Sequence, residues 1–380
     1  MRGIGAFQVM DLVARAQQLD ALGRSVVHME VGEPDFPTPA PIVEAGQRAL
    51  GAGRTGYTAA AGLPQLREAV ARHYLEREGV ALSPQRVLLT PGASGALQVA
   101  LALLVNPGDR VLLSDPGYPC NRHLVRLLGG EAVELPVGAE SAYQLTAELV
   151  ARHWSEDTAA VMLASPSNPT GTLADPLEMA SIAAFASERG AGLIVDEIYR
   201  GLIYEQSPPS ALCQIPDAFV INSFSKYFGM TGWRLGWLVT PPGYEREAEK
   251  LAQNLFLAPP TPAQYAALAA FEPATLEIVE GRRQAFQQRR DFLIPALRSL
   301  GFGLPVTPTG AFYAYAHCGA VTEDSHGFAW RALEEAAVAM APGVDFSPSR
   351  GAAHLRFAYT TGVQHLEAGI ERLQRLITRS

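Results

Sequence analysis

The chain has 380 residues, of which 48% are hydrophobic and 18% are charged. A chain of this length and composition predicts two or three folded domains and excludes disorder or a small disulfide-stapled scaffold. The formal net charge of -8 offers no basic surface to a nucleic-acid backbone or an anionic membrane, so a small-molecule partner is favoured.

Cysteine usage and hydropathy indicate where the protein works. Cys120, Cys213 and Cys318 are widely spaced and predict neither a disulfide framework nor a zinc site. No stretch reaches the ~18 consecutive apolar residues of a membrane span. Residues 1–12 lack the apolar core of a signal peptide. We therefore expect a cytoplasmic protein with no membrane or nucleic-acid partner.

The first 37 residues contain one helical segment, 9–22, which we expect to pack with a C-terminal domain. From residue 40 onward, apolar runs of strand length alternate with helix-like segments. This order predicts a doubly wound α/β sheet of mostly parallel strands. The predicted strands are 87–90, 111–114, 159–164, 192–195 and 218–222, with clear helices at 63–78, 96–105 and 177–189.

A further strand, 235–240, is expected to be antiparallel, because residues 224–234 are too few for a helical crossover. The last third of the chain predicts a smaller α+β domain. We place the large domain at 38–280 and assign 1–37 together with 281–380 to the small one. The small domain's predicted elements are a helix at 276–300, strands at 312–317, 338–341 and 355–359, and a closing helix at 363–378.

The chain contains only two lysines, Lys226 and Lys250. Lys250 lies in a charged helical segment, where pairing with a nearby glutamate accounts for it. Lys226 instead ends an apolar strand and has aromatic neighbours. A lysine taken alone is usually a surface residue. A desolvated lysine has a lowered pKa, however, and is suited to forming an imine.

Other polar and aromatic residues follow the predicted parallel strands. Asp196 and Tyr199 come after one strand, Asn168 after another and Tyr118 after a third. Ligands of open α/β sheets bind at the carboxyl ends of the strands, and a buried aspartate there needs a partner. Taken singly, Asp196 is explained as a helix N-cap and the other residues as parts of ordinary turns.

A turn of small residues at 90–96 leaves backbone N–H groups open to an anion at a predicted helix N-terminus. Arg234 could complete such a site. Two other motifs are rejected. Residues 51–56 match G-x-G-x-x-G but follow a helix instead of a strand, and the acidic strand end at 193–197 has no P-loop to accompany it.

Eight short segments, taken in chain order, resemble the class I/II pyridoxal-5'-phosphate aminotransferases of the aspartate aminotransferase type. The likeness runs from about residue 4 to about residue 375. It rests on Gly-Glu-Pro-Asp-Phe (32–36), Gly-Tyr-Thr (56–58), Pro-Gly-Ala-Ser-Gly-Ala (91–96), Asp-Pro-Gly-Tyr-Pro (115–119), Ser-Asn-Pro-Thr-Gly (167–171), Asp-Glu-Ile-Tyr (196–199), Ser-Phe-Ser-Lys (223–226) and Arg-Leu-Gly (234–236).

The resemblance implies a seven-stranded sheet with one antiparallel strand, bound pyridoxal 5'-phosphate, and ping-pong transfer from an L-amino acid to a 2-oxo acid. Lys226 would form a Schiff base with the cofactor and carry the proton. Asp196 would pair with the ring nitrogen, Tyr199 and Asn168 with the phenolic oxygen, and Tyr118 would stack on the ring. The implied phosphate ligands are Gly92, Ala93, Ser94, Ser223, Ser225 and Arg234, with Tyr57 reaching over from the other subunit of a homodimer with shared sites.

The resemblance also assigns the substrate carboxylate to Arg356, assisted by Gly32 and Asn168. Ser347 stands where the family usually has glycine, near the pocket wall at Phe346. Residues 251–260, where dicarboxylate-specific relatives often carry a cation, contain none, so we expect neutral donors to be preferred over aspartate. Apolar Ile4 and Phe7 are candidates for the side-chain pocket, and Arg2 or Arg24 for a replacement cation.

Two alternatives remain open at this point. A C–S β-lyase would share every cofactor contact and differ in leaving-group chemistry. The cofactor-sensing domain of a transcription regulator would share the fold, but we expect no room for a DNA-binding module before residue 4.

Overall fold

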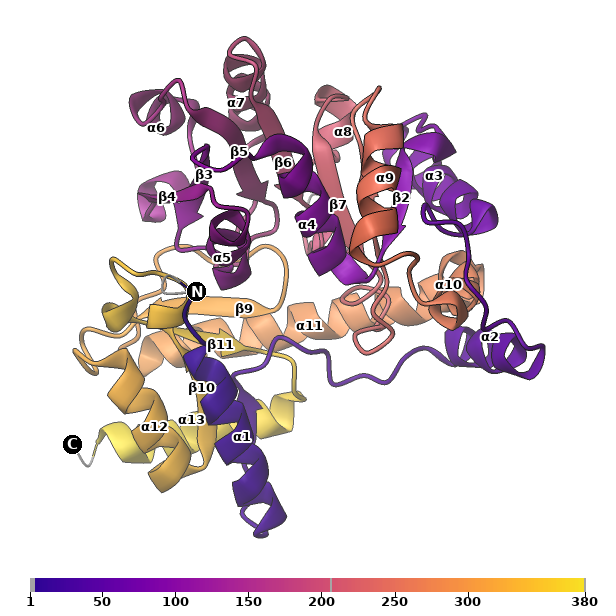
Figure 1. The fold of residues 1–380 in the computed structure, drawn as a ribbon. Helices are drawn as coiled ribbons and strands as arrows, with labels where there is room; N and C mark the ends of the chain where they lie inside the picture. The colour runs from indigo at the N-terminus through magenta and orange to yellow at the C-terminus, as the bar shows by residue number, and fades with distance from the viewer. Residues whose placement is uncertain (1–3, 206, 379–380) are drawn as a thin grey trace.

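The computed structural model describes residues 4–205 and 207–378, and it contains two separate β-sheets (Figure 1). The larger sheet has seven strands in the order β2-β8-β7-β6-β5-β3-β4. The strands from β7 to β4 in this order pair in parallel, whereas β8 is antiparallel to both of its neighbours, β7 and the edge strand β2, as the short connection before β8 predicts. The strands are β2 (Val87–Thr90), β3 (Arg110–Asp115), β4 (Glu131–Pro136), β5 (Thr158–Ala164), β6 (Gly192–Asp196), β7 (Phe219–Ser223) and β8 (Gly236–Val239).

Helices cover both faces of the large sheet, which makes it doubly wound, and alternate residues of each strand enter different cores. In β5, Val161 and Leu163 join the core that contains residues of α3 and α7. Ala160 and Met162 join the core that contains residues of α4, α5 and α9. Burial on both faces explains why these strands are nearly continuous apolar runs. The helices are α2 (Ala40–Gly51), α3 (Pro64–Glu78), α4 (Gly92–Leu104), α5 (Pro119–Leu127), α6 (Ala147–Arg152), α7 (Pro176–Ser187), α8 (Ala211–Gln214), α9 (Glu245–Leu255) and α10 (Thr261–Ala267).

The smaller sheet has four strands in the order β1-β10-β11-β9 and is built from both ends of the chain. Strand β1 pairs in parallel with β10, so the N-terminal segment becomes part of this sheet. Helix α1 packs on β10 and α12, while the long α11 extends toward α2 and α10 (Figure 1). The elements are α1 (Gln8–Ala21), β1 (Val27–Met29), α11 (Pro273–Ser299), β9 (Tyr313–His317), α12 (Ser325–Ala336), β10 (Val338–Pro342), β11 (His354–Ala358) and α13 (Val363–Ile377).

The predicted strands agree with the observed ones to within one or two residues, but β1 and β4 have no counterpart among the predicted strands. Strand β1 has only three residues, too few for a recognisable pattern. In β4, Glu131 and Pro136 are exposed at the ends, and only Leu135 is fully buried. As an edge strand, β4 is covered less than the central strands, so it lacks the apolar run by which the others are recognised.

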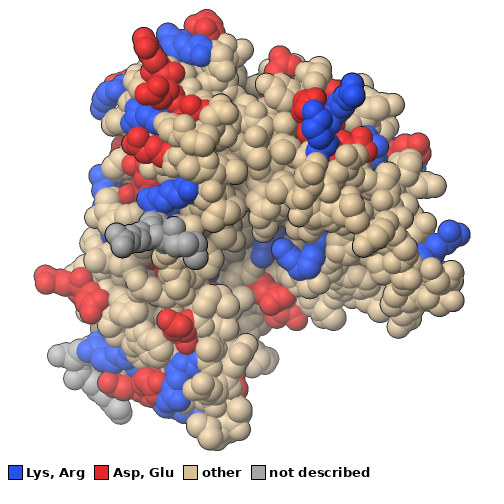
Figure 2. All heavy atoms as spheres, in the orientation of Figure 1, with Lys and Arg blue, Asp and Glu red and all other residues tan. Residues whose placement is uncertain are grey.

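The distribution of surface charge and the length and hydropathy of the helices can be described from the structure. Acidic and basic side chains are interspersed over the face shown in Figure 2, with no extended basic patch. Within residues 4–205 and 207–378, no helix has the length and apolar character needed to cross a membrane.

Candidate active site

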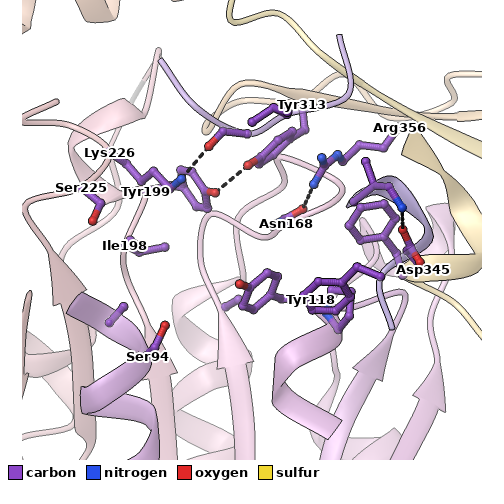
Figure 3. Close-up of a pocket in the computed structure, with 18 of the residues that line it drawn as sticks. Ser94, Tyr118, Asn168, Ile198, Tyr199, Ser225, Lys226, Tyr313, Asp345 and Arg356 are labelled. Carbon is purple, nitrogen blue, oxygen red and sulfur yellow. Dashed lines mark hydrogen bonds between the residues drawn. The ribbon is translucent and has the colours of Figure 1, made fainter. Parts of the chain in front are cut away.

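A cavity of about 310 Å³ lies at the carboxyl ends of the parallel strands, between the two sheets (Figure 3). Its walls come from loops of the large sheet, from α1 and from the small sheet. The lining includes these residues proposed from the sequence: Gly32, Ala93, Ser94, Tyr118, Asn168, Asp196, Tyr199, Ser225, Lys226, Arg234 and Arg356.

Lys226 reaches into this cavity from the loop that follows β7. Its Nζ donates a hydrogen bond to the backbone oxygen of Gly32 at 2.5 Å. Burial lowers the pKa of the amine to about 8, Glu33 opposes that shift, and Arg356 and Arg234 add to it. A substantial share of the amine is therefore neutral near physiological pH, as a nucleophile or a proton carrier requires.

Asp196 is the last residue of β6 and is only 7% exposed. One of its oxygens accepts a hydrogen bond from the Ile198 N–H at 3.0 Å. Burial, opposed by the Ile198 hydrogen bond and reinforced by the adjacent Glu197, raises the pKa of the carboxyl to about 6. The residues described here give Asp196 no cationic partner, so its other oxygen is free to pair with a protonated ligand atom in the cavity.

An anion site forms where α4 begins. Gly92 adopts a positive φ of 70°, and a Cβ there would lie 2.8 Å from the guanidinium of Arg234, so glycine lets the arginine approach. Ala93 and Ser94 follow in the first turn and line the cavity, as does Ser225. Free N–H groups of a helix N-terminus next to an arginine and a hydroxyl suit a phosphate group.

Tyr199 and Tyr118 stand on the walls of the same cavity. The Tyr199 hydroxyl lies 2.7 Å from the hydroxyl of Tyr313, which comes from β9 of the small sheet. Gly32 permits this arrangement, because a Cβ at that position would overlap the Tyr313 hydroxyl. Burial raises the pKa of both Tyr199 and Tyr118, which keeps them protonated as hydrogen-bond donors.

Arg356 lies on β11 and is 5% exposed, yet the structure gives it no carboxylate partner among the described residues. Its guanidinium donates to Asn168 Oδ1 at 3.0 Å and to the Glu30 backbone oxygen at 2.6 Å. The rings of Tyr313 and Phe346 lie 4.4 and 4.5 Å from its Cζ, and its Nε is buried without a hydrogen bond. A buried cation with unused donors at a cavity wall is suited to binding an anionic ligand.

Three residues proposed from the sequence do not line the cavity. Gly92 lies behind it, beneath Arg234. Ser223 Oγ is within 3.0 Å of the Leu235 backbone oxygen and 2.9 Å of Ser225 Oγ, so it supports Ser225 from behind. Tyr57 is 85% exposed and borders a different surface hollow.

The arm residues considered for the side-chain pocket separate in the structure. Phe7 lines the cavity, whereas Ile4 and Arg24 are not among its lining residues. Arg2 lies outside the described residues.

Tyr313, Asp345 and Glu30 also line the cavity, and the sequence reasoning did not identify them. Tyr313 and Glu30 belong to or adjoin strands of the small sheet, and Asp345 lies in a turn after β10. Alternation along 312–317 does put Tyr313 on one face of a strand. No local pattern, however, indicates that this face meets the large sheet.

Comparison with known proteins agrees with this geometry. Residues 24–373 match the aminotransferase class I and II family. The valine–pyruvate aminotransferase of Mycobacterium tuberculosis is 36% identical over 98% of this chain and 96% of that protein. The aspartate/prephenate aminotransferase of Thermus thermophilus is 34% identical over 97% and 95%. A crystal structure of an aminotransferase from Mycobacterium tuberculosis has a TM-score of 0.95 and 36% identity, covering 100% of this chain and 98% of that one.

The chain therefore belongs to the class I and II aminotransferases. It is an aminotransferase that depends on pyridoxal 5'-phosphate. The cavity has three features that fit this cofactor: a buried lysine of lowered pKa, a carboxylate without a cationic partner, and the N-terminus of α4. These relatives are named as aminotransferases, so the comparison lends no support to the C–S lyase alternative.

Proposed function

We propose that the enzyme transfers the amino group of a neutral L-amino acid with an apolar side chain to a 2-oxo acid, in two half-reactions that take place in this cavity. The observation that carries this proposal is the charge inventory of the cavity. Among the residues that the structure describes, the cations lining the cavity are Lys226, Arg234 and Arg356. In this proposal Lys226 serves the chemistry, Arg234 binds the cofactor phosphate and Arg356 binds the substrate α-carboxylate.

When bound, pyridoxal 5'-phosphate supplies an aldehyde that captures amines and a ring that accepts the electrons of a carbanion. In the proposal, Lys226 holds the cofactor covalently and, once displaced by the substrate amine, takes the proton from the substrate Cα. An amine whose pKa is lowered to about 8 can both accept and return a proton near neutral pH.

The other cofactor contacts follow from the same walls. Asp196 keeps a proton on the ring nitrogen, Tyr199 and Asn168 hydrogen-bond the phenolic oxygen, and Tyr118 stacks on the ring. The phosphate is assigned to a group of residues at the start of α4 and after β7: Ala93, Ser94, Ser225 and Arg234, with Gly92 and Ser223 behind them.

Arg356 binds the substrate carboxylate in this proposal, with Asn168 and the backbone of Gly32 alongside. The guanidinium is already oriented by Asn168 and by the Glu30 backbone oxygen, and Tyr313 and Phe346 hold it between their rings. Such preorganisation lowers the entropic cost of binding the carboxylate.

Within residues 4–205 and 207–378, no further cation lines the cavity beside α1. An apolar wall is formed there by Phe7, Val9, Met10 and Val13. Two acidic residues, Asp345 and Glu30, also line the cavity. A second substrate carboxylate would lose its hydration without gaining a partner, whereas an apolar side chain gains from burial. The two named relatives act on different donors, so their names do not decide the question.

We expect valine and phenylalanine to react faster than aspartate in the first half-reaction. The measurement is the half-reaction rate constant divided by the substrate dissociation constant for aspartate, alanine, valine and phenylalanine. An advantage of tenfold or more for valine over aspartate, about 1.4 kcal/mol, is expected. The same advantage in favour of aspartate would contradict the proposed donor class.

We also propose that the protein is a homodimer with shared sites. Support comes from Tyr57, which is 85% exposed in the single chain although an aromatic side chain gains from burial. It lies beside a surface hollow lined by Arg54, Thr261 and Tyr265, away from the cavity of its own chain.

If Tyr57 serves the neighbour's site, mixing Tyr57→Ala chains with Lys226→Ala chains should restore activity. In such a heterodimer one site has both defects and the other has none, so activity should approach half that of the wild-type dimer. The control mixes Tyr57→Ala chains with Tyr57→Ala/Lys226→Ala chains, which leaves no intact site. No recovery in verified heterodimers of the first kind would show that each chain carries its own complete site.

Two further proposals concern the location of the protein and its division into domains. A cytoplasmic location is supported by the free state of Cys120, Cys213 and Cys318. A division into residues 38–280 and residues 1–37 with 281–380 is supported by the two sheets, each of which draws its strands from one of these sets.

A further inference from the structure

Helix α1 contributes the apolar wall of the cavity but begins without a cap of its own. Its N-cap residue is Phe7, whose side chain cannot accept hydrogen bonds from the free N–H groups of the first turn. The later part of the helix is anchored by Leu12, Ala16 and Leu19, which are fully or nearly fully buried. In the first turn, Met10 is 57% exposed and Val9 is only partly buried.

Asp345, which is 337 residues away in sequence from the helix start, supplies the missing cap. Its two carboxylate oxygens accept hydrogen bonds from the N–H groups of Gln8 at 2.9 Å and Val9 at 2.8 Å. Asp345 is 5% exposed and lies near Arg356 at the edge of the cavity (Figure 3). A carboxylate at a helix N-terminus is also favoured by the helix dipole.

The turn that carries Asp345 is itself held by the large sheet. The backbone oxygen of Asp345 accepts a hydrogen bond from Arg122 of α5 at 2.6 Å. The next residue, Phe346, accepts one from the Gly117 N–H at 3.0 Å. Gly117 precedes Tyr118, so one turn joins the ring-stacking wall of the cavity to the first turn of α1.

The same turn contacts the carboxylate-binding arginine and the apolar wall. Phe346 packs on Arg356 and forms a small buried cluster with Tyr315 and Ala341, against which Val9 packs. The wall residues Phe7 and Val9 therefore take their positions from a turn that also contacts Arg356 and adjoins Tyr118. Moving this turn would change the space available to a substrate side chain.

We propose that Asp345 is a specificity-determining positioning residue: it fixes the first turn of α1 so that Phe7 and Val9 form the wall that contacts the substrate side chain. This inference rests on the proposed donor class, because the wall discriminates only among substrates that reach it. A substrate with a short side chain, such as alanine, gains little from that wall. Valine and phenylalanine depend on it.

The test uses the cofactor-loaded enzyme and three variants. Asp345→Ala removes both hydrogen bonds, Asp345→Asn keeps one acceptor oxygen and therefore one of the two hydrogen bonds, and Asp324→Ala serves as the matched control. Asp324 caps α12 through the N–H groups of His326 at 3.1 Å and Gly327 at 3.0 Å, and it does not line the cavity. The readouts are kcat and KM for alanine and valine, and amide hydrogen exchange at residues 8–10.

For Asp345→Ala, we expect the ratio of kcat/KM for valine to that for alanine to fall about tenfold, mainly through the KM for valine. Amides at residues 8–10 should exchange at least tenfold faster. Asp345→Asn, which keeps one of the two hydrogen bonds, should give a ratio and exchange rates between those of wild type and Asp345→Ala. Asp324→Ala should change neither the ratio nor the exchange of these amides.

Unchanged exchange in Asp345→Ala would overturn the positioning role, and faster exchange with an unchanged valine-to-alanine ratio would overturn the specificity role. A further variant, Phe7→Ala, keeps the cap and removes the wall side chain. It should lower the ratio without accelerating exchange, which keeps the inference testable if Asp345→Ala does not fold. Failure of the proposed donor class is recognised separately, from aspartate leading in the wild-type enzyme.

Discussion

Replacing Lys226 by alanine should abolish transamination and leave the fold intact. Lys226 is the only lysine among the residues that line the cavity, and Lys250, the other lysine of the sequence, lies on α9 in an ion pair with Glu247. No other lysine is therefore placed to hold the cofactor or carry the proton. The expected result is loss of turnover by several orders of magnitude and loss of the absorption of lysine-bound cofactor.

Lys250→Ala is the matched control, because it removes the same side chain from an exposed helical face. It should retain wild-type turnover and the wild-type spectrum, and both variants should have the wild-type circular dichroism. Full turnover by Lys226→Ala would remove the central assignment.

The lowered pKa of Lys226 also sets a pH dependence. With a pKa of about 8, roughly a tenth of the amine is neutral at pH 7, against about one part in three thousand at its ordinary pKa of 10.5. Covalent capture of added pyridoxal phosphate by the apoprotein should therefore rise with pH and level off above about pH 8. A rate that continues to rise tenfold per pH unit to pH 10 would contradict the lowered pKa.

Replacing Asp196 by asparagine should slow the half-reaction by about a hundredfold or more, about 2.8 kcal/mol. A neutral amide cannot stabilise a positive charge on the ring nitrogen, so the ring would accept electrons less readily. Cofactor affinity should change far less, because the residues assigned to the phosphate are untouched. The measurements are single-turnover rates and the dissociation constant of the cofactor.

The apoprotein offers an independent readout for the same substitution. The pKa of Asp196 is raised to about 6 from an ordinary value of 3.8, so the folded state binds more protons than the unfolded state between these values. Its burial therefore lowers stability as pH rises from about 4 to 6, and the loss persists above pH 6. Asp196→Asn should thus be more stable than wild type at pH 7 without cofactor, and Asp324→Asn is the remote control.

In the kinetic experiment, a half-reaction rate of Asp196→Asn within a few-fold of wild type would contradict the role of Asp196.

The amino-acid sequence by itself determined the α/β architecture and most of the residues that we propose for the cofactor. Central parallel strands are covered on both faces, so they appear as apolar runs, and the residues that follow them must meet at one edge of the sheet. Asp196, Asn168 and Lys226 each follow such a run, and the near absence of lysine made Lys226 identifiable. The edge strand β4 was not predicted, because it is covered less by other elements and carries polar residues.

Only the tertiary structure decided the substrate side. Arg356 meets Asn168 and the Glu30 backbone oxygen across 188 and 326 residues of chain, and Asp345 caps a helix 337 residues before it. Periodicity and capping patterns extend over a few residues, so they carry no information about such pairings. The family resemblance supplied Arg356, but its pairing with Asn168 and the roles of Tyr313 and Asp345 depend on how the small sheet and α1 close over the strand ends of the large sheet. That arrangement is set by packing between distant segments, because the cavity wall exists only once both sheets are in place.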